Sequence, residues 1–471
     1  MRVLPRLAIV APLALASLVL PACPEQPAEG EGEGEEGEGE GEPSAVMALL
    51  ETHLVDTDVD VAITAGFALA LRPDGRFAVA YGRNQSANTV ECNQFGGGTI
   101  TVDAWDLVVV DEQADGTFRT RVVDSVPPMP AAVVDVAADP TSGALILAYT
   151  GGDPANGACQ GSDLRLAVES GDTFTLSTIN ANAPTGAPCR EVVTQQVCNQ
   201  GDCVGKNPGV AVGADGNVAI TWIDEHFCFG DTDIYKSDLE IATGPTGGLA
   251  LNSVATETGS GWNNTVTIAD DGSVLVAYQT LGNTTVYDDP VAGTGPAHDV
   301  PDGIYASVSQ ADGTFNEVLL FERASTTSRV ATAHRGGSGY YVAWQDQGTD
   351  QLLLYNSVDN GETWTPGFIE QTGNTGKDPA IAFLSDGTFV AAYGHCKDRD
   401  DGTQFCSQAQ DGVRIAFREP GGAFIRTTFT GDDEDTDGTN VDMAVAADDT
   451  VVVLSFNAST SRVVVQRFQK Q

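Results

Sequence analysis

Positive charge is scarce in this 471-residue chain. It has 23 Lys and Arg residues against 66 Asp and Glu residues, which gives a formal net charge of -43 at pH 7. A surface this acidic repels phosphate backbones, so we expect no nucleic acid among its partners. The acidity fits either solubility and adaptation to salt or an affinity for cations, and the composition leaves both interpretations open.

Methionine and long apolar runs are also rare. Four Met and 53 Gly residues favour many strands and tight turns over long helices. One continuous apolar run stands out, at residues 7–20, and its fourteen residues are too few to span a bilayer, which takes about 20.

Residues 1–22 are predicted to be an export signal. Arg2 and Arg6 precede the apolar run, and Leu20-Pro-Ala-Cys23 ends it. Basic residues, a short apolar run and a small residue before the cleavage site are typical of signal peptides. The Leu-x-Ala-Cys ending resembles the lipobox of bacterial lipoproteins, which implies that Cys23 is acylated and becomes the mature N-terminus. We therefore expect an exported protein that is lipid-anchored to a membrane of the bacterial cell envelope. The alternative is an ordinary secretory signal followed by an unrelated Cys.

Residues 23–44 are predicted to be a disordered tether. They are rich in alternating Glu and Gly, contain nine Glu residues and lack side chains that could build a core. The remaining segment, 45–471, is the expected folded domain. It holds 21 basic and 57 acidic residues, so the acidity is not confined to the tether.

An internal repeat begins after the tether. An apolar strand, a turn and a second strand ending in an aromatic residue recur in seven copies, which end at Tyr81, Tyr149, Trp222, Tyr278, Trp344, Tyr393 and Phe456. Five copies carry Gly six residues before the aromatic residue, where a two-residue hairpin turn needs positive φ. Ser338 and Thr450 stand there in the other two copies.

A second hairpin follows the first one, as at 107–123, 304–321 and 413–429. Four antiparallel strands per copy and seven copies predict an all-β fold, a seven-bladed β-propeller over residues 45–471. A six-bladed propeller and a β-sandwich are the alternatives. The last copy has three strands, so we expect an N-terminal strand at His53–Ile63, where Val alternates with Asp, to close that blade.

The fifth copy contains the sequence Ser357-Val-Asp359-Asn-Gly361-Glu-Thr-Trp364. It resembles the Asp-box, or BNR repeat, of sialidase-like propellers. The resemblance implies a structural device between the third and fourth strands of a blade, on the face opposite the active site. It also implies sialidase-like glycoside hydrolysis as a possible activity, but the arginine triad and the Tyr–Glu pair of that family cannot be placed on this sequence.

Long connections are expected to gather on one face of the propeller, at residues 83–104, 151–162, 180–207, 224–237, 281–302 and 394–411. Such loops suggest a binding surface, although they can also simply cover the channel. Polar residues follow the aromatic residues or begin the innermost strands, and the predicted binding set is Arg83, Lys206, Asn263, Arg329, Lys377, Asp378 and His395. Asp224 and Asp346 would form an acid/base pair if they lay close together, and would otherwise form salt bridges with Lys206, Lys377 or Arg329.

One loop has the spacing of calcium-binding loops. Asp433, Asp435 and Asp437 alternate before Gly438, and Asp442 follows. Alternating carboxylates can wrap a hard cation, but Ala444 stands at the position of the bidentate Glu, so a solvated acidic loop is the alternative. No cofactor other than calcium is indicated.

Eight cysteines besides Cys23 lie in the predicted loops. An even number in an exported protein predicts four disulfides. Proximity in sequence favours Cys198–Cys203 and Cys396–Cys406, and leaves the pairing of the others open, namely Cys92, Cys159, Cys189 and Cys228.

Together these features favour a non-catalytic, envelope-anchored binding module for a protein or a glycan. A sialidase-like glycoside hydrolase and a scaffold within an envelope assembly are the alternatives. We expect a monomer whose contact with the membrane is made through lipidated Cys23.

Overall fold

The computed structural model describes residues 46–56, 66–93, 99–129, 133–152, 162–181, 190–192, 195–197, 203–225, 237–255, 259–281, 284–289, 294–322, 329–336, 339–346, 348–371, 374–396, 412–429, 439–457 and 461–471. The chain divides into two units, Met1–Ser44 and Ala45–Gln471, and all described residues belong to the second unit.

The described residues form β-strands and no helix, as expected from the composition, so they include no helix that could cross a membrane. In chain order the strands are β1 (Met47–Asp56), β2 (Phe67–Leu71), β3 (Phe77–Asn93), β4 (Thr99–Glu112), β5 (Phe118–Met129), β6 (Val134–Ala138), β7 (Leu145–Gly152), β8 (Ser162–Ser170), β9 (Thr173–Asn180), β10 (Arg190–Val192), β11 (Gln195–Val197), β12 (Cys203–Val212), β13 (Val218–Glu225), β14 (Ser237–Gly244), β15 (Ala250–Ala255), β16 (Trp262–Ile268), β17 (Val274–Thr280), β18 (Thr284–Asp289), β19 (Thr294–Val300), β20 (Gly303–Ser309), β21 (Phe315–Glu322), β22 (Ala331–Arg335), β23 (Gly339–Asp346), β24 (Gln351–Ser357), β25 (Thr365–Glu370), β26 (Asn374–Phe383), β27 (Phe389–Cys396), β28 (Gly412–Arg418), β29 (Ile425–Phe429), β30 (Thr439–Val445), β31 (Val451–Asn457) and β32 (Arg462–Lys470).

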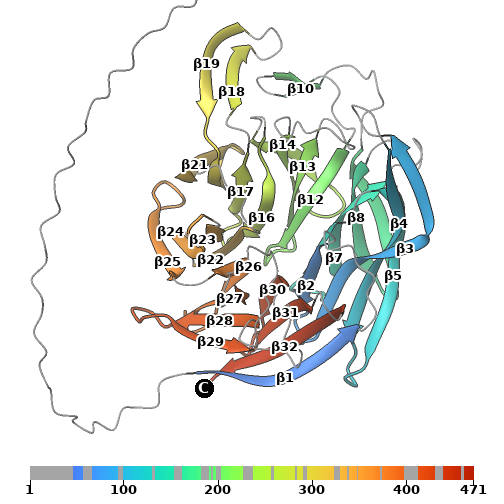
Figure 1. The fold of residues 1–471 in the computed structure, drawn as a ribbon, viewed down its shortest axis with the longest axis vertical. Coiled ribbons are helices and arrows are strands. Elements are labelled where there is room, and N and C mark those ends of the chain that lie inside the picture. Colours follow the sequence, from blue (N-terminus) through green and yellow to red (C-terminus); the bar gives the residue numbers. More distant parts are fainter. Residues whose placement is uncertain are drawn as a thin grey trace, which may run out of the picture. The chain divides into compact units, whose positions relative to one another are not determined.

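Seven four-stranded antiparallel units surround a common axis (Figure 1). Blades 1 to 7 consist of β2–β5, β6–β9, β12–β15, β16–β17 with β20–β21, β22–β25, β26–β29, and β30–β32 with β1. The innermost strand of each blade contacts that of the next blade, and β30 of the last contacts β2 of the first, so the ring is closed. The structure therefore confirms the all-β, seven-bladed propeller and excludes the six-bladed alternative. Two further hairpins lie outside the blades. The β10–β11 hairpin lies in the connection from blade 2 to blade 3, and the β18–β19 hairpin lies between the second and third strands of blade 4.

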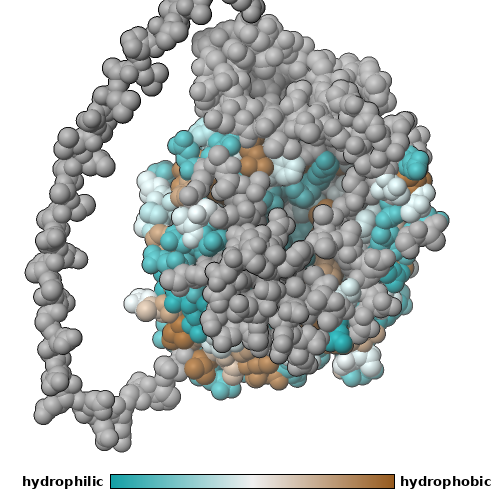
Figure 2. All heavy atoms as spheres, in the orientation of Figure 1, coloured by the Kyte–Doolittle hydropathy of each residue, from teal (hydrophilic) through white to brown (hydrophobic). Residues whose placement is uncertain are grey.

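An N-terminal strand closes the last blade, as predicted. β1 pairs antiparallel with β32, from Met47 opposite Lys470 to Asp56 opposite Val463. The strand begins earlier than the predicted His53, because Met47 and Val55 both bury their side chains, and residues 57–63 lie outside the described residues. The outer side of β1 exposes leucines such as Leu49 and Leu54, in a largely hydrophilic surface with small hydrophobic patches (Figure 2).

The turns between the first and second strands show why Gly and Asp recur in the repeat. Gly75 has φ 81° and Gly387 has φ 82°, a region that side chains other than Asn and Asp rarely adopt. The carboxylate before the Gly accepts a backbone hydrogen bond two residues on, as Asp386 does from Thr388 at 2.8 Å.

The seventh copy differs by one residue from its predicted alignment. Asp449, with φ 64°, occupies the Gly position of that turn, because its N–H bonds to Ala446 O just as Gly75 N–H bonds to Arg72 O. Ser455 therefore corresponds to the aromatic position, and Phe456 lies one residue further on. In the fifth copy Ser338 lies outside the described residues.

The other six aromatic residues are all buried between blades. Tyrosine hydroxyls also join one blade to the next: Tyr149 of β7 donates a 2.8 Å hydrogen bond to Asp124 of β5, and Tyr393 of β27 donates a 2.6 Å bond to Glu370 of β25. Burial raises the pKa of both tyrosines, so each hydroxyl remains a protonated donor at neutral pH.

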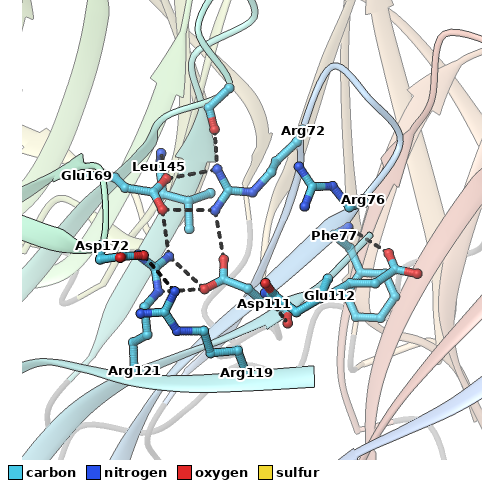
Figure 3. A network of polar contacts seen from close by, with 12 residues as sticks. Arg72, Arg76, Phe77, Asp111, Glu112, Arg119, Arg121, Leu145, Glu169 and Asp172 are labelled. Atoms are coloured by element: carbon cyan, nitrogen blue, oxygen red, sulfur yellow. Dashed lines mark hydrogen bonds and ion pairs between the residues drawn. The ribbon is translucent and has the colours of Figure 1, made fainter. Parts of the chain in front are cut away.

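A buried ion-pair network joins blades 1 and 2 (Figure 3). Glu169 of β8 accepts hydrogen bonds from Arg72 at 2.8 Å, from Arg121 at 2.7 Å and from the backbone N–H of Leu145 at 2.9 Å. Asp111 of β4 binds the same two arginines at 2.7 Å each. Both carboxylates and both guanidinium groups are largely shielded from solvent, with side-chain exposures between 5% and 14%. Such a network is costly to break, because each removed partner leaves a buried charge behind.

We expect Glu169→Gln to lower the free energy of unfolding by about 3 kcal/mol, because it leaves two buried arginines with one carboxylate between them. Chemical denaturation at neutral pH measures this change. Asp172→Asn is the matched control, since Asp172 is 82% exposed and pairs with the exposed Arg119 at 2.7 Å. The control should unfold like the wild type. Equal stability of the two variants would contradict the assigned role of the network.

Candidate functional site

A cavity lies on the axis of the ring, where the innermost strands begin. Its volume is about 250 Å³. Every blade contributes to its wall at an equivalent position of the repeat. The residues at this position, from blade 1 to blade 7, are Gly66, Val133, Asn207, Asn263, Arg329, Asp378 and Asn440. The connections between blades and between second and third strands lie at this end of the ring, because the strands of each blade alternate in direction.

Four of these equivalent residues share an unusual backbone conformation. Asn207, Asn263, Asp378 and Asn440 have φ angles of 45°, 52°, 45° and 49°. Each lies at a β-bulge, where the register of the innermost strand shifts against the second strand. Asn and Asp tolerate the left-handed region better than other side chains, so the residue type follows from the local geometry. The bulges place these polar residues at the wall of the cavity.

Arg329 spans the cavity. Its guanidinium nitrogens lie 4.0 Å from Asp135 of blade 2 and 3.8 Å from Asp442 of blade 7, and neither blade adjoins blade 5, which carries the arginine. Both distances exceed hydrogen-bond length. Within the part of the chain that the structure describes, Arg329 donates no hydrogen bond. Its side chain is 34% exposed, so its donors face the open space of the cavity.

The carboxylates of the cavity also hold the ring together. Asp135 accepts a 2.7 Å hydrogen bond from Val210 N of blade 3, and Asp442 accepts a 2.9 Å bond from Leu69 N of blade 1. Asp378 of blade 6 accepts a 3.0 Å bond from Asn440 N of blade 7. Each carboxylate thus binds the innermost strand of the next blade.

The surroundings of Asp135 raise its pKa to about 6. Burial is the largest cause, and the nearby charge of Asp442 adds to it. The charge of Arg329 and two backbone hydrogen bonds lower the pKa, but they compensate only in part. Asp135 therefore gains a proton in the folded protein at a higher pH than an exposed aspartate.

The structure brings together only some of the residues predicted to bind a ligand. Asn263, Arg329 and Asp378 line the cavity. Lys206 and Lys377 lie on β12 and β26, next to the residues of the wall but not among them. Arg83 forms a 3.2 Å ion pair with Asp106 on the neighbouring strand, and His395 is buried on β27.

Asp224 and Asp346, the predicted acid/base pair, lie in different blades. Asp224 ends β13 of blade 3 and Asp346 ends β23 of blade 5, with blade 4 between them. Both are buried, and Asp346 accepts hydrogen bonds from Gly348 N and the Thr349 hydroxyl in the following turn. The acid/base pairing of Asp224 with Asp346 stays a prediction.

The Asp-box lies between the third and fourth strands of blade 5, at the end of the ring opposite the cavity. Asp359 accepts hydrogen bonds from Thr363 Oγ1 at 2.6 Å, from Thr363 N at 2.9 Å and from the Ser357 hydroxyl at 2.8 Å, which lower its pKa to about 2. Gly361 has φ 81°, and the Trp364 indole donates to Gly361 O at 3.2 Å. All of these contacts are internal to the turn.

Several predicted sites lie outside the described residues. These are Asp433, Asp435 and Asp437 of the calcium loop, Cys23, and most other cysteines; Cys92, Cys203 and Cys396 lie on strands whose side chains are not described at these positions. Among the described residues, no group of three or more His, Cys, Asp or Glu side chains is placed to hold a metal ion. Asp442, the last residue of the predicted calcium set, instead faces Arg329 and binds the backbone of β2.

Asp135 is the main residue that the sequence analysis missed. Its signal lies in the repeat: Val134-Asp135-Val136-Ala137 of blade 2 matches Val441-Asp442-Met443-Ala444 of blade 7. Both aspartates stand two residues after the position that forms the wall of the cavity. An alignment of the innermost strands with one another would have paired them.

No protein-family model matches this chain, and no curated protein sequence matches it. Solved structures with a similar fold include the Hadza microbial sialidase Hz136, at 13% identity and a TM-score of 0.46 over 79% of this chain and 76% of that chain. A second is a triple mutant of AofleA from Arthrobotrys oligospora, at 11% identity and a TM-score of 0.42 over 84% of this chain and 93% of that chain. A third is Trypanosoma rangeli sialidase, at 12% identity and a TM-score of 0.42 over 76% of this chain and 56% of that chain. This chain thus spans just over half of the last protein. Sialidase propellers are among the similar folds, as the Asp-box resemblance implies, and at these identities the likeness concerns the fold alone.

The raised pKa of Asp135 predicts a pH-dependent stability. A carboxyl whose pKa is higher in the folded protein than in the unfolded chain contributes stability below the unfolded pKa, and this contribution is lost as pH rises through the folded pKa. We expect the free energy of unfolding of the wild type to fall by about 2 kcal/mol relative to Asp135→Asn between about pH 4 and about pH 7. Chemical denaturation across this range measures the difference. Parallel pH profiles for the two proteins would contradict the prediction.

Proposed function

We propose that this protein is an exported, membrane-tethered binding module that takes up a polar group of a glycan or of a protein in its axial cavity. The tether of residues 23–44 would hold the propeller away from the membrane. The end of the ring with the long connections would then face the ligand. The proposal requires no catalysis.

The observation that carries this proposal is the convergence of all seven blades on one polar cavity. A cavity that serves packing alone is filled by apolar side chains. Here the wall carries Asn207, Asn263, Asp378 and Asn440, and it includes Arg329, which donates no hydrogen bond to the described residues. Convergent polar groups in a concave site are the usual mark of a binding site.

Replacement of Arg329 tests the role of the cavity. We expect Arg329→Met to lower the affinity for a ligand found on a glycan or protein array by about tenfold or more, because charge-assisted hydrogen bonds are lost. Arg119→Met, on the exposed outer side of blade 1, is the matched control and should bind normally. Isothermal titration calorimetry measures both affinities, and thermal denaturation checks that both variants fold. Unchanged binding by Arg329→Met would place the ligand site elsewhere.

The membrane tether is tested at Cys23. We expect the wild type, expressed in a bacterium, to fractionate with membranes and to incorporate labelled palmitate. Cys23→Ser should lose the label and appear in the soluble envelope fraction. A membrane-bound Cys23→Ser protein without a label would contradict lipid anchoring.

Glycoside hydrolysis is the second candidate function. It is favoured by one specific observation, namely that two carboxylates, Asp135 and Asp442, lie within 4.0 Å of the guanidinium group of Arg329 and that the pKa of Asp135 is raised to about 6. Two neighbouring carboxyl groups, one of them with a raised pKa, are the arrangement that glycosidases use. Fluorogenic glycosides, sialosides included, distinguish the two functions. Turnover that disappears in Asp135→Asn would replace the binding proposal with an enzymatic one.

A further inference from the structure

The charge of the axial cavity restricts the ligands that it can accept. Asp135 and Asp378 line the cavity, Asp442 lies 3.8 Å from Arg329, and Arg329 is the one cation among the described residues of the wall. These four groups carry an excess of two negative charges when all of them are ionised. The folded domain around it is acidic as well, with 57 acidic and 21 basic residues. An anionic ligand would have to enter against this potential, although Arg329 alone would attract it.

The hydrogen-bonding groups restrict the ligand further. The donors of Arg329 and the acceptors of Asp135 and Asp442 face one another across gaps of 4.0 and 3.8 Å. A carboxylate only accepts hydrogen bonds and would be repelled by the aspartates, while an ammonium group is attracted by the aspartates but only donates, so it cannot accept a hydrogen bond from the arginine. A hydroxyl group both donates and accepts, so it can bind the arginine and an aspartate at once.

The remaining wall is suited to the same chemistry. Asn207 and Asn440 have amide side chains, which are uncharged and both donate and accept hydrogen bonds. Asn263 also lines the wall, and its amide donates a 3.3 Å hydrogen bond to Gln279. The volume of about 250 Å³ lies just below the range of about 300–1,000 Å³ that encloses drug-sized ligands. The cavity therefore has room for one small ring with several hydroxyl groups rather than for a chain.

We infer that the axial cavity binds a neutral polyhydroxylated group, such as one uncharged sugar unit, and discriminates against sugars that carry a carboxylate. This inference rests on the proposed function and specifies its ligand. Arg329 and the aspartates would bind adjacent hydroxyl groups, and the asparagines would bind the others.

The experiment titrates the purified full chain with three classes of probe: methyl hexosides as neutral sugars, N-acetylneuraminic and glucuronic acids as anionic sugars, and glucosamine as a cationic sugar. We expect at least one methyl hexoside to bind about tenfold or more tightly than the anionic probes. Its affinity should depend little on salt, because a neutral ligand is not attracted by the charge of the cavity. Arg329→Met should abolish this binding, and Arg119→Met should not.

Asp378→Asn provides a second readout. The asparagine retains an oxygen for the hydrogen bond from Asn440 N, and it removes one negative charge from the cavity. We expect the affinity ratio between neutral and anionic sugars to shrink by several-fold in this variant, with unchanged thermal stability. An unchanged ratio would contradict the role given to the charge.

Two failures are distinguishable. If an anionic or cationic sugar binds best and Arg329→Met abolishes that binding, the cavity is a binding site and the inference about its ligand is wrong. If no probe binds and no array ligand depends on Arg329, the proposed function is wrong as well.

Discussion

The structure depends on the hydrogen bonds that join each blade to the next. A four-stranded sheet alone leaves apolar side chains exposed on its faces and backbone hydrogen-bonding groups unpaired at its edges. Closure of the ring also requires every innermost strand to be held at the correct distance from the axis. Asp135, Asp378 and Asp442 do this directly, because each accepts a backbone hydrogen bond from the following blade. Farther from the axis, buried aromatic residues and the ion pairs around Glu169 complete the same contacts.

The same carboxylates give the axial cavity its chemistry. A residue that must bind a neighbouring strand cannot be exchanged freely, and its second oxygen still faces the axis. The ring therefore acquires a polar centre as a consequence of its closure, and Arg329 balances part of the resulting charge. Because of this dual role, the stability of the ring and the binding properties of the cavity depend on the same group of residues, which includes Asp135 and Arg329. It also distinguishes this centre from the Asp-box, whose Asp359 accepts hydrogen bonds from residues of its own turn, Ser357 and Thr363.

Charge is the property that links the cavity to the rest of the molecule. The acidic surface opposes the approach of anions, and the cavity continues the same bias on a smaller scale. A neutral ligand is exempt from this opposition, whereas an anionic sugar is not, and the described wall of the cavity contains one cation, Arg329. This electrostatic bias is the basis of the ligand that we infer for the cavity.

The sequence by itself determined the fold of this protein. The fold could be predicted because its signals are local: turn residues with positive φ, alternating apolar strands and the recurrence of both. They indicated the seven blades, their hairpins and the strand that closes the last blade. The errors were of a few residues, at β1 and in the seventh copy. Asn263, Arg329 and Asp378 were found because the repeat places them at equivalent positions. Only the tertiary structure decided that Arg329 reaches Asp135 and Asp442 across the axis. These contacts join residues of non-adjacent blades, and no local pattern encodes which side chains meet at the centre of a closed ring.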